Sequence, residues 1–289
     1  MSVAEFSIRP AVAGDSTACA ATAYAAHARV SAIHNFPSEL PTLAIATRFI
    51  RSKLENPRCR GYVAEKNGCV IGSIFVTAVD DCPAGAIGPL TVEPAYEGGV
   101  GAALMQEALT EAARMDIEQV RLIQSPTHLR SLSLYMKAGF DLREPLLVVT
   151  STALAHAPDK SGMRRAALSD KTDCACLCRK AYGFARTTEL NEAIGNSTAM
   201  VLERNDRIVG YACSVGFRGH AVAGTVEDLM ILLAHTPKSQ GAGIFIPARN
   251  GALLRWLFRN GARALWPAAL WSIGDFHEPT VPYVPSMLF

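Results

Sequence analysis

The sequence repeats itself, and this internal repeat restricts the fold more strongly than any other feature of the chain. Residues 63–72 (VAEKNGCVIG) and 201–210 (VLERNDRIVG) share a Val, a Glu, a basic residue, an Asn and a final Gly. Each segment reads as two strands joined by a two-residue turn, Asn67-Gly68 in one and Asn205-Asp206 in the other. That pattern is typical of a β-hairpin.

Two further similarities follow the same order along the chain. The helical stretch SLSLYMKAGF at 131–140 is echoed by LLRWLFRNGA at 253–262. The stretches SIRPAVAGD at 7–15 and MRRAALSD at 163–170 each predict a strand followed by a helix. Because three similarities occur in register, the sequence predicts two copies of one fold.

The two copies are separated by a polar stretch at 151–162 (STALAHAPDKSG) that contains Pro158 and Gly162. We therefore expect domains at 1–150 and 163–289 joined by this linker, with a long loop inside one domain as the alternative. The first copy predicts an α/β fold with a mixed sheet and helices on its faces. Its expected strands lie at 6–10, 61–66, 70–79, 86–92, 119–124 and 146–150, and its helices at 17–30, 41–53, 101–115 and 129–138.

Helix starts are marked by acidic or hydroxyl residues, with Asp15 as the expected N-cap in the first copy and Ser169 or Asp170 in the second. Apolar residues make up 49% of the chain and charged residues 19%, with a mean hydropathy of +0.16. This composition excludes an intrinsically disordered protein. The formal charge of +2 argues against a nucleic-acid partner, since such proteins usually carry a basic excess.

No apolar stretch approaches the roughly 20 residues that a membrane span requires. The first ten residues lack the apolar run of a signal peptide, so we expect a cytoplasmic protein with no membrane partner. The eight cysteines predict buried or free thiols rather than disulfides. Cys174, Cys176 and Cys178 lie on one predicted helix, only the first and last share a face, and no metal site is expected.

The most informative segment is the stretch VEPAYEGGVGAALM at 92–105, a strand end, a glycine-rich turn and a helix. Gly98, Gly99 and Gly101 let the backbone approach a ligand closely, and the first N–H groups of a helix favour anions. The turn lacks the lysine of a Walker loop, and Leu104 stands where a dinucleotide fingerprint needs a small residue. By itself the cluster is also compatible with a purely structural turn.

Two motifs together indicate a family. Val92-x-Pro94 with Gly99-x-Gly101-Ala102, followed by LYMKAGF at 134–140, resembles the GNAT superfamily of acyl-CoA-dependent N-acyltransferases. The resemblance covers most of 6–150. It implies an enzyme that transfers an acetyl group from acetyl-CoA, as cosubstrate, to a primary amine by direct attack. The acceptor would be a small-molecule or peptide amine, and a homodimer is left open.

The resemblance also implies roles for individual residues. The backbone of a splayed strand would pair with the pantetheine arm, and the glycine-rich turn would wrap the pyrophosphate. Tyr135 would protonate the departing thiolate, while His128, where the family usually has Asn, would offer a hydrogen bond to the pantetheine. The implied acetyl-CoA-binding residues are Leu90, Thr91, Val92, Glu97, Gly98, Gly99, Val100, Gly101, Ala102, Ala103, His128 and Ser131.

Several alternatives stay open at this point. Tyr135 also fits a core aromatic on an amphipathic helix. Asp80 and Asp81 could act as a general base through water, although two turn-forming aspartates fit the same segment. A sensor or scaffold that binds acyl-CoA without transferring it is the competing function. An enzyme using a longer acyl chain is a third.

The second copy departs from the first at the position of the site. Leu257 stands where the first copy has its tyrosine, and Asn250 takes the place of His128. Gly241 and Gly243 precede a predicted strand rather than a helix. We therefore expect a degenerate GNAT-like domain without an acyl-CoA site. Its tail residues could line an acceptor pocket or pack over the sheet; they are Phe276, His277, Glu278 and Tyr283.

Overall fold

The computed structural model describes residues 6–79, 82–96, 98–150, 155–239, 241 and 243–287. The chain divides into two compact units. The first takes in residues up to Val79, Pro83–Asp141 and Trp271–Gly274. The second takes in Leu142–Leu270 and the residues from Asp275 onwards.

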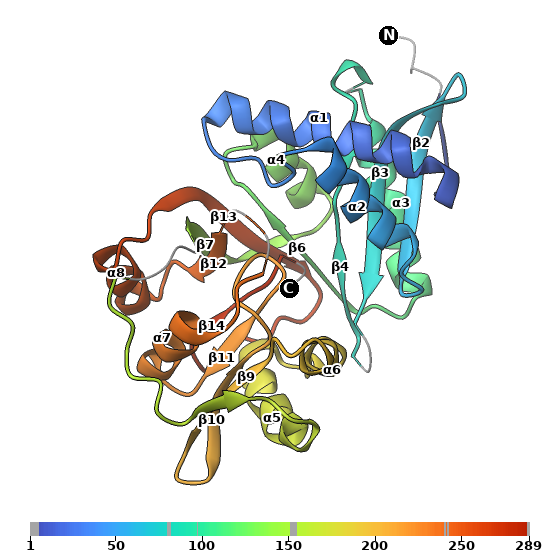
Figure 1. Ribbon diagram of the computed structural model, residues 1–289. Coiled ribbons are helices and arrows are strands. Elements are labelled where there is room, and N and C mark those ends of the chain that lie inside the picture. The colour runs from blue at the N-terminus through green and yellow to red at the C-terminus, as the bar shows by residue number, and fades with distance from the viewer. Residues whose placement is uncertain are drawn as a thin grey trace. The chain divides into compact units, whose positions relative to one another are not determined.

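The first unit is a mixed sheet with α1 and α2 on one face and α3 on the other (Figure 1). Its strands follow the order β1-β2-β3-β4-β6, antiparallel except for the parallel pair β4–β6. The strands are β1 (Ser7–Pro10), β2 (Cys59–Lys66), β3 (Cys69–Ala78), β4 (Ala84–Ile87), β5 (Thr91–Val92) and β6 (Gln119–Gln124). The helices are α1 (Ser16–His34), α2 (Leu43–Leu54), α3 (Val100–Arg114) and α4 (Leu129–Lys137), with 3-10 turns at Ala13–Asp15 and Pro94–Tyr96.

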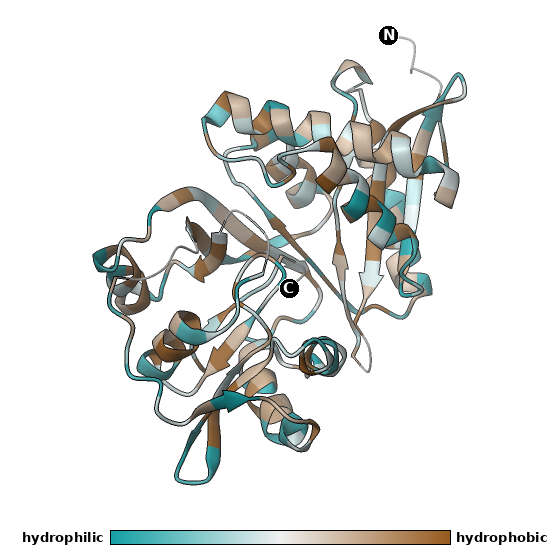
Figure 2. Ribbon diagram, in the orientation of Figure 1, coloured by the Kyte–Doolittle hydropathy of each residue, from teal (hydrophilic) through white to brown (hydrophobic). Residues whose placement is uncertain are grey.

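Small residues let the helices approach this sheet closely. The mostly apolar strand β3 (Figure 2) is buried from Ile71 to Thr77. Cys19, Ala20 and Ala23 of α1 lie in one core cluster with Phe75 of β3. A side chain at Gly61 would meet the Phe75 ring at 2.7 Å, so the glycine makes room for the aromatic core.

The prediction of one strand over 86–92 is wrong. The segment forms two short strands, β4 and β5, which are separated at Gly88 and Pro89. Strand β4 pairs with β6 only as far as Ala86 and Arg121, whereas β5 pairs with β3. Proline carries no N–H for a ladder, so the strand cannot continue regularly through it. The sheet therefore splits beyond Ala86, and β5 diverges from the end of β6.

The second unit repeats this plan with a sheet in the order β14-β11-β10-β9-β8 and an antiparallel pair of β7 and β12. Its strands are β7 (Asp141–Thr150), β8 (Met163–Arg165), β9 (Met200–Arg204), β10 (Arg207–Ala212), β11 (Ala221–Ala223), β12 (Gly243–Pro247), β13 (Ala264–Ile273) and β14 (Tyr283–Val284). Its helices are α5 (Lys171–Tyr182), α6 (Thr187–Gly195), α7 (Val226–His235) and α8 (Gly251–Arg259), with a 3-10 turn at Leu168–Asp170. Strands β7 and β13 extend past the unit's boundary.

Alternating residues separate the two cores of this sheet. Val201 and Val222 belong to the cluster around α5, whereas Leu202, Ala221 and Ala223 belong to the cluster around α7. A strand's side chains point to opposite faces in turn, so one short sheet serves two helical layers.

Both predicted hairpins are present. The turn residues Asn67 and Gly68 have φ values of 51° and 75°, and Asn205 and Asp206 have 50° and 58°. Two consecutive positive values define the turn type that suits the strand twist of a tight hairpin. The polar tip of the β9–β10 hairpin projects away from the apolar strands (Figure 2).

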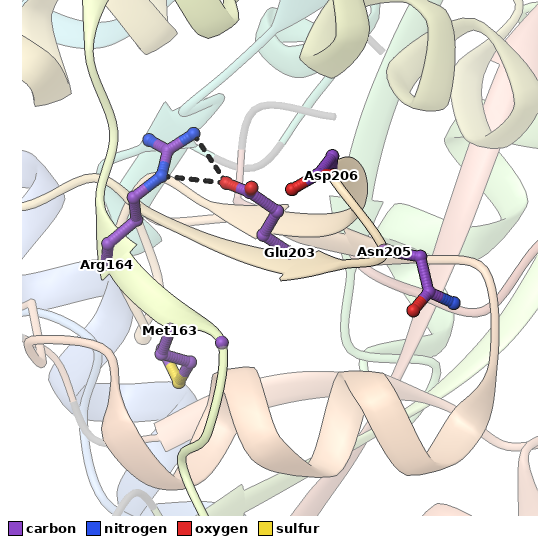
Figure 3. Close-up of a pocket in the computed structure, with 6 residues that line it drawn as sticks. Met163, Arg164, Glu203, Asn205 and Asp206 are labelled. Atoms are coloured by element: carbon purple, nitrogen blue, oxygen red, sulfur yellow. Dashed lines mark hydrogen bonds and ion pairs between the residues drawn. The ribbon is translucent and has the colours of Figure 1, made fainter.

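The repeat extends to one ionic arrangement. Arg9 of β1 contacts Asp15 and Glu65, each at 2.8 Å. In the second unit Arg164 of β8 contacts Asp170 at 2.7 Å and Glu203 at 3.0 Å (Figure 3). Each arginine thus joins the first strand of its sequence repeat to the start of the first helix and to the hairpin.

Asp15 and Asp170 occupy the expected N-cap positions but act differently from the expectation. Each carboxylate accepts a hydrogen bond from the N–H group three residues earlier, Val12 for Asp15 and Ala167 for Asp170, both at 2.8 Å. Neither side chain accepts from the helix that follows it. The hydrogen bonds from the arginine side chains lower the pKa of each carboxyl. Both carboxylates therefore stay ionised to a lower pH than a free aspartate does.

The compact units and the sequence repeats do not coincide at one point. Strand β7 closes the first repeat, but its residues from Leu142 onward belong to the second unit, and the first unit includes Trp271–Gly274. The boundaries at 150 and 163 stay predictions about the repeats. Residues 155–162 of the predicted linker form no helix or strand, and 151–154 lie outside the described residues.

We predict that Asp15→Asn and Asp170→Asn each lower the free energy of unfolding at pH 7 by about 1–3 kcal/mol, because each removes a charged partner from an arginine. A carboxyl with a lowered folded-state pKa stabilises the fold above its unfolded value of 3.8 and stops doing so as the pH falls through the lower folded value. The deficit should shrink below pH 4 in urea unfolding curves. Asp173→Asn, at an exposed position of α5, is the control and should change stability by less than about 0.5 kcal/mol. A deficit independent of pH would contradict the ionic origin.

Candidate functional site

The glycine-rich turn forms the start of α3. Gly99 is the N-cap, with a φ of 90° that side-chain-bearing residues rarely adopt. An added Cβ at Gly98 or Gly99 would meet nothing within 4 Å, so the backbone here is open to a ligand. A Cβ at Gly101 would lie 3.6 Å from Leu134 and 3.7 Å from Val92, which brings α3, α4 and β5 together.

The first turn of α3 offers a limited set of N–H groups. An α-helix leaves its first N–H groups without intrahelical acceptors and carries a partial positive charge there. Ala102 is exposed, while the side chain of Val100 is buried and leaves only its backbone to face a ligand. Ala103 N–H already donates to Gly99 O at 3.0 Å, so it is not free for a phosphate. Glu97 lies outside the described residues.

The strand beside this turn is β5. Thr91 is buried, and its hydroxyl lies 3.2 Å from that of Ser73 on β3. The backbone of Thr91 and Val92 pairs with Ser73 and Gly72. Leu90 precedes this pairing and is half-buried. The three predicted pantetheine-binding residues therefore lie after the last residue of β4 that pairs with β6.

Helix α4 contributes the predicted acid. The Tyr135 side chain is buried and meets the Phe140 ring edge-on, with ring centroids 5.9 Å apart. Burial raises the pKa of Tyr135 to about 12, and a hydrogen bond with Ser131 opposes this increase. A phenol with such a pKa is fully protonated at neutral pH, which is the state a proton donor needs. The core-aromatic alternative accounts for the burial but not for the polar contact.

His128 and Ser131 meet on the same helix. His128 is the N-cap of α4, and its Nδ1 makes a short hydrogen bond with the Ser131 hydroxyl. Gln124, at the end of β6, donates from Nε2 to the backbone carbonyl of His128 at 3.1 Å. The predicted residues of α4 thus form one connected group at the end of β6.

Lys66 was not predicted from the sequence. Its ammonium lies 5.6 Å from the centre of the Tyr96 ring. The cation comes from the β2–β3 hairpin, 30 residues earlier in the chain, so no local motif shows it. Lys66 places a positive charge next to Tyr96, which stands two residues before Gly98 in the sequence.

The second unit differs at each corresponding position. Helix α7 has Thr225 as its N-cap, whose hydroxyl accepts from Asp228 N–H at 3.1 Å, and Glu227 and Asp228 lie in its first turn. Asp228 is itself paired with Arg204 at 2.9 Å, so this helix start already holds an ion pair within the unit. Strand β14 pairs antiparallel with β11 through Tyr283 and Val284 and also contacts β12.

The remaining predictions for this unit agree with that arrangement. Leu257 is a core residue, and Asn250 caps α8 by accepting from Leu253 N–H at 3.2 Å. Gly243 starts strand β12, not a helix. Of the tail residues, Tyr283 is buried, and His277 Nε2 lies 3.1 Å from Lys180 O. The tail therefore packs against the unit at these positions.

A buried polar cluster lies in the same unit. His220 Nε2 is 2.9 Å from the Tyr211 hydroxyl and 3.7 Å from Cys213 Sγ, while His220 Nδ1 is 3.2 Å from Glu189 Oε2. Arg186 binds Glu189 and the Ser286 hydroxyl, each at 2.6 Å. Cys213, His220 and Glu189 have the connectivity of a nucleophile, a base and an orienting acid.

Burial makes this cluster unsuited to such chemistry. Burial raises the pKa of the Cys213 thiol well above its ordinary value. Burial and the nearby Arg186 charge lower the pKa of His220 to about 4. A protonated thiol beside a weakly basic imidazole is not an activated nucleophile. The cluster is a structural polar core that fastens the tail to α6.

The predicted general base, the cysteines and the expected absence of a metal site remain to be placed. Asp80 and Asp81 are not among the described residues. Cys174 and Cys178 are buried and Cys176 is exposed, as the helical spacing predicts. Within the described ranges no three His, Cys, Asp or Glu side chains gather as a metal site would require. Nor does any described helix combine the length and the apolar character needed to cross a bilayer.

A shallow pocket lies at the junction of β8 and the β9–β10 hairpin (Figure 3). Gly162, Met163, Asn205 and Asp206 are among its lining residues. Its arginine, Arg164, is already held by two carboxylates. The pocket therefore belongs to the ionic arrangement of the fold and not to the site in the first unit.

Comparisons with known proteins agree with this geometry. Residues 27–140 match the model of the acetyltransferase (GNAT) family, which indicates an acyltransferase. A putative acetyltransferase from Pyrococcus horikoshii is similar over 100% of this chain and 96% of its own, with a TM-score of 0.75 and 17% identity. A tandem GNAT protein from the clavulanic acid biosynthesis pathway covers 93% of this chain and 98% of its own, with a TM-score of 0.56 and 14% identity. A search of curated proteins finds no match.

At these identities the two structures show the fold alone. They match the chain along nearly its whole length, and together with the family match they support two GNAT-like domains in one mixed α/β chain. The predicted fold class is therefore confirmed.

The buried cluster predicts a dependence of stability on pH. Folded His220 has a pKa of about 4 against an ordinary value of 6.5, so the unfolded chain binds more protons between these values. The free energy of unfolding should therefore fall as the pH decreases from about 6.5 to 4. Urea unfolding across this window should show a shallower pH slope in His220→Gln than in the wild type. Equal slopes would show that His220 is not a buried neutral imidazole.

Proposed function

We propose that the first unit, whose residues 27–140 match the model of the acetyltransferase (GNAT) family, transfers an acetyl group from acetyl-CoA to a primary amine. The acceptor attacks the thioester directly, without an acyl-enzyme intermediate. The observation that carries the proposal is the open start of α3 beside the diverging strand β5, with Tyr135 on the adjoining helix.

The pyrophosphate fits the start of α3. The N–H groups of Gly99, Val100, Gly101 and Ala102 face the helix entrance, where the helix dipole favours negative charge. The open space around Gly98 and Gly99 admits a phosphate close to the backbone. Lys66 adds a mobile cation from the hairpin side. Together they bind the anionic part of acetyl-CoA.

The pantetheine arm follows β5 in the direction of α4. Leu90, Thr91 and Val92 lie beyond the last pairing of β4 with β6, so this strand has left its parallel neighbour. An extended amide-bearing arm adds to such a strand as another strand would. This path leads from the turn at Gly101 to α4, because a Cβ added at Gly101 would lie within 3.7 Å of both Val92 and Leu134.

Tyr135 donates the proton that the leaving group needs. When an amine attacks the acetyl carbonyl, the C–N bond forms, the C–S bond breaks, and sulfur departs as a thiolate. The phenol of Tyr135 gives its proton to that sulfur, and the nitrogen loses its extra proton to water. A pKa of about 12 keeps the phenol protonated over the whole range in which amines lose their protons.

Substitution at Gly101 tests the binding site. Acetyl-CoA at 100 times its dissociation constant should stabilise the wild type by about 2.7 kcal/mol. Gly101→Asp places a carboxylate at the start of α3 and should abolish the shift in a thermal melt. Space exists for the side chain, since an added Cβ lies no closer than 3.6 Å to its neighbours. Gly101→Asn is the matched control and should keep most of the shift.

A calorimetric titration with acetyl-CoA reports the number of binding sites per chain. Isothermal calorimetry should give one acetyl-CoA per chain, because β14 and two carboxylates occupy the corresponding place in the second unit. An equal loss in Gly101→Asn and Gly101→Asp would show that size, not charge, removes the ligand. A wild type that does not respond at millimolar acetyl-CoA would contradict the proposal.

Tyr135→Phe tests the chemistry. We expect kcat for thiol release, measured with a panel of primary amines, to fall by about 10²–10⁴ while the acetyl-CoA thermal shift is retained. Phe140→Leu, which alters the ring packed on Tyr135 without removing a hydroxyl, is the control and should cost far less activity. Because the phenol titrates near pH 12, wild-type kcat should rise with pH as the amine deprotonates.

Two outcomes would change the assignment. A Tyr135→Phe enzyme with full kcat would remove the phenol from the mechanism. Acetyl-CoA binding without turnover on any amine would favour an acyl-CoA sensor instead.

A further inference from the structure

The burial of Tyr135 makes its deprotonated form unfavourable after it has donated a proton. Once it has given its proton to the thiolate, a phenolate remains in a buried place, and burial is what raises its pKa to about 12. A charged oxygen there is costly and must regain a proton before the next turnover. Direct entry of bulk water is restricted because the side chain is only 8% exposed.

A chain of polar groups leads from this phenol towards solvent. Ser131 lies one helical turn before Tyr135, on the same side of α4, and its hydroxyl lowers the pKa of the phenol that burial raises. The Ser131 hydroxyl in turn makes the short hydrogen bond with Nδ1 of His128. His128 caps α4, is half-buried, and has its backbone carbonyl held by Gln124. The three side chains therefore run in order along one helix from its start to the buried hydroxyl.

We propose that His128 and Ser131 form a proton relay that reprotonates Tyr135 after each transfer, an inference that rests on the proposed function. The Ser131 hydroxyl donates its proton to the phenolate, and His128 Nδ1–H donates to Ser131. His128 takes a proton from water at its other ring nitrogen and returns to its starting tautomer by exchange. Every proton lost to the thiolate is thereby replaced, and no further reactant is needed.

The chain itself offers the substitution that separates relay from capping. In the second unit Asn250 stands at the position of His128 and caps α8 through Leu253 N–H. His128→Asn therefore replaces the imidazole by a side chain that suits this helix start but cannot shuttle a proton. Ser131→Ala breaks the chain in the middle, and Tyr135→Phe removes its end.

A double-mutant cycle is the test. In the wild-type background His128→Asn and Ser131→Ala should each lower kcat at least about tenfold. The dissociation constant for acetyl-CoA, from calorimetry, should stay within about twofold. In the Tyr135→Phe background neither substitution should lower kcat further, because a relay to an absent hydroxyl has no effect.

The outcomes are separable. If the losses persist in the Tyr135→Phe background, or appear as weaker acetyl-CoA binding, His128 and Ser131 bind the cosubstrate and the relay is wrong. If both single variants keep wild-type kcat, reprotonation proceeds by another route and the relay is also wrong. Failure of the proposed function is distinct, since the wild type itself would then release no thiol with any amine. A thermal melt of each variant without ligand shows whether it is folded.

Discussion

The split of the sheet at Gly88 and Pro89 is the constraint on which the site depends. Strand β4 pairs with β6, but β5, which follows it, pairs only with β3 in the described ladders. One edge of β5 is therefore not paired with β6. Backbone polar groups at such an edge must find partners, from protein, ligand or water. The start of α3 lies beside that edge, since a Cβ added at Gly101 would come within 3.7 Å of Val92.

The second unit shows the same constraint met from within the chain. Strand β11 precedes α7 just as β5 precedes α3, and β14 pairs with it along Ala221 and Val222. Arg186 and the buried cluster hold that tail through Ser286. The first turn of α7 also carries the acidic residues Glu227 and Asp228, whereas the first turn of α3 carries none. In the second unit a strand of the same chain therefore pairs with the edge of β11.

Most of the fold could be predicted because the signals were local. The paired turns at 67–68 and 205–206 determine the hairpins, and the glycine-rich turn and Tyr135 mark the site on their helices. The strand break at Gly88 was missed because 86–92 reads as a continuous apolar run until pairing partners are known. Lys66 and β14 were missed for a related reason: each meets its partner across a long sequence separation.

The same reasoning explains why the two arginines escaped notice as a pair. Arg9 and Arg164 lie in the similar stretches at 7–15 and 163–170, but their shared role depends on carboxylate partners that the sequence alone does not pair with them. Each holds a strand, a helix start and a hairpin together, and these are the elements that carry the rest of the sheet. Selection on function can then remodel one copy's ligand edge, as at β14, without disturbing the ionic arrangement that both copies need. Asp15 and Asp170 therefore belong to the ionic arrangement of the fold, whereas the role of Tyr135 is a proposal about chemistry.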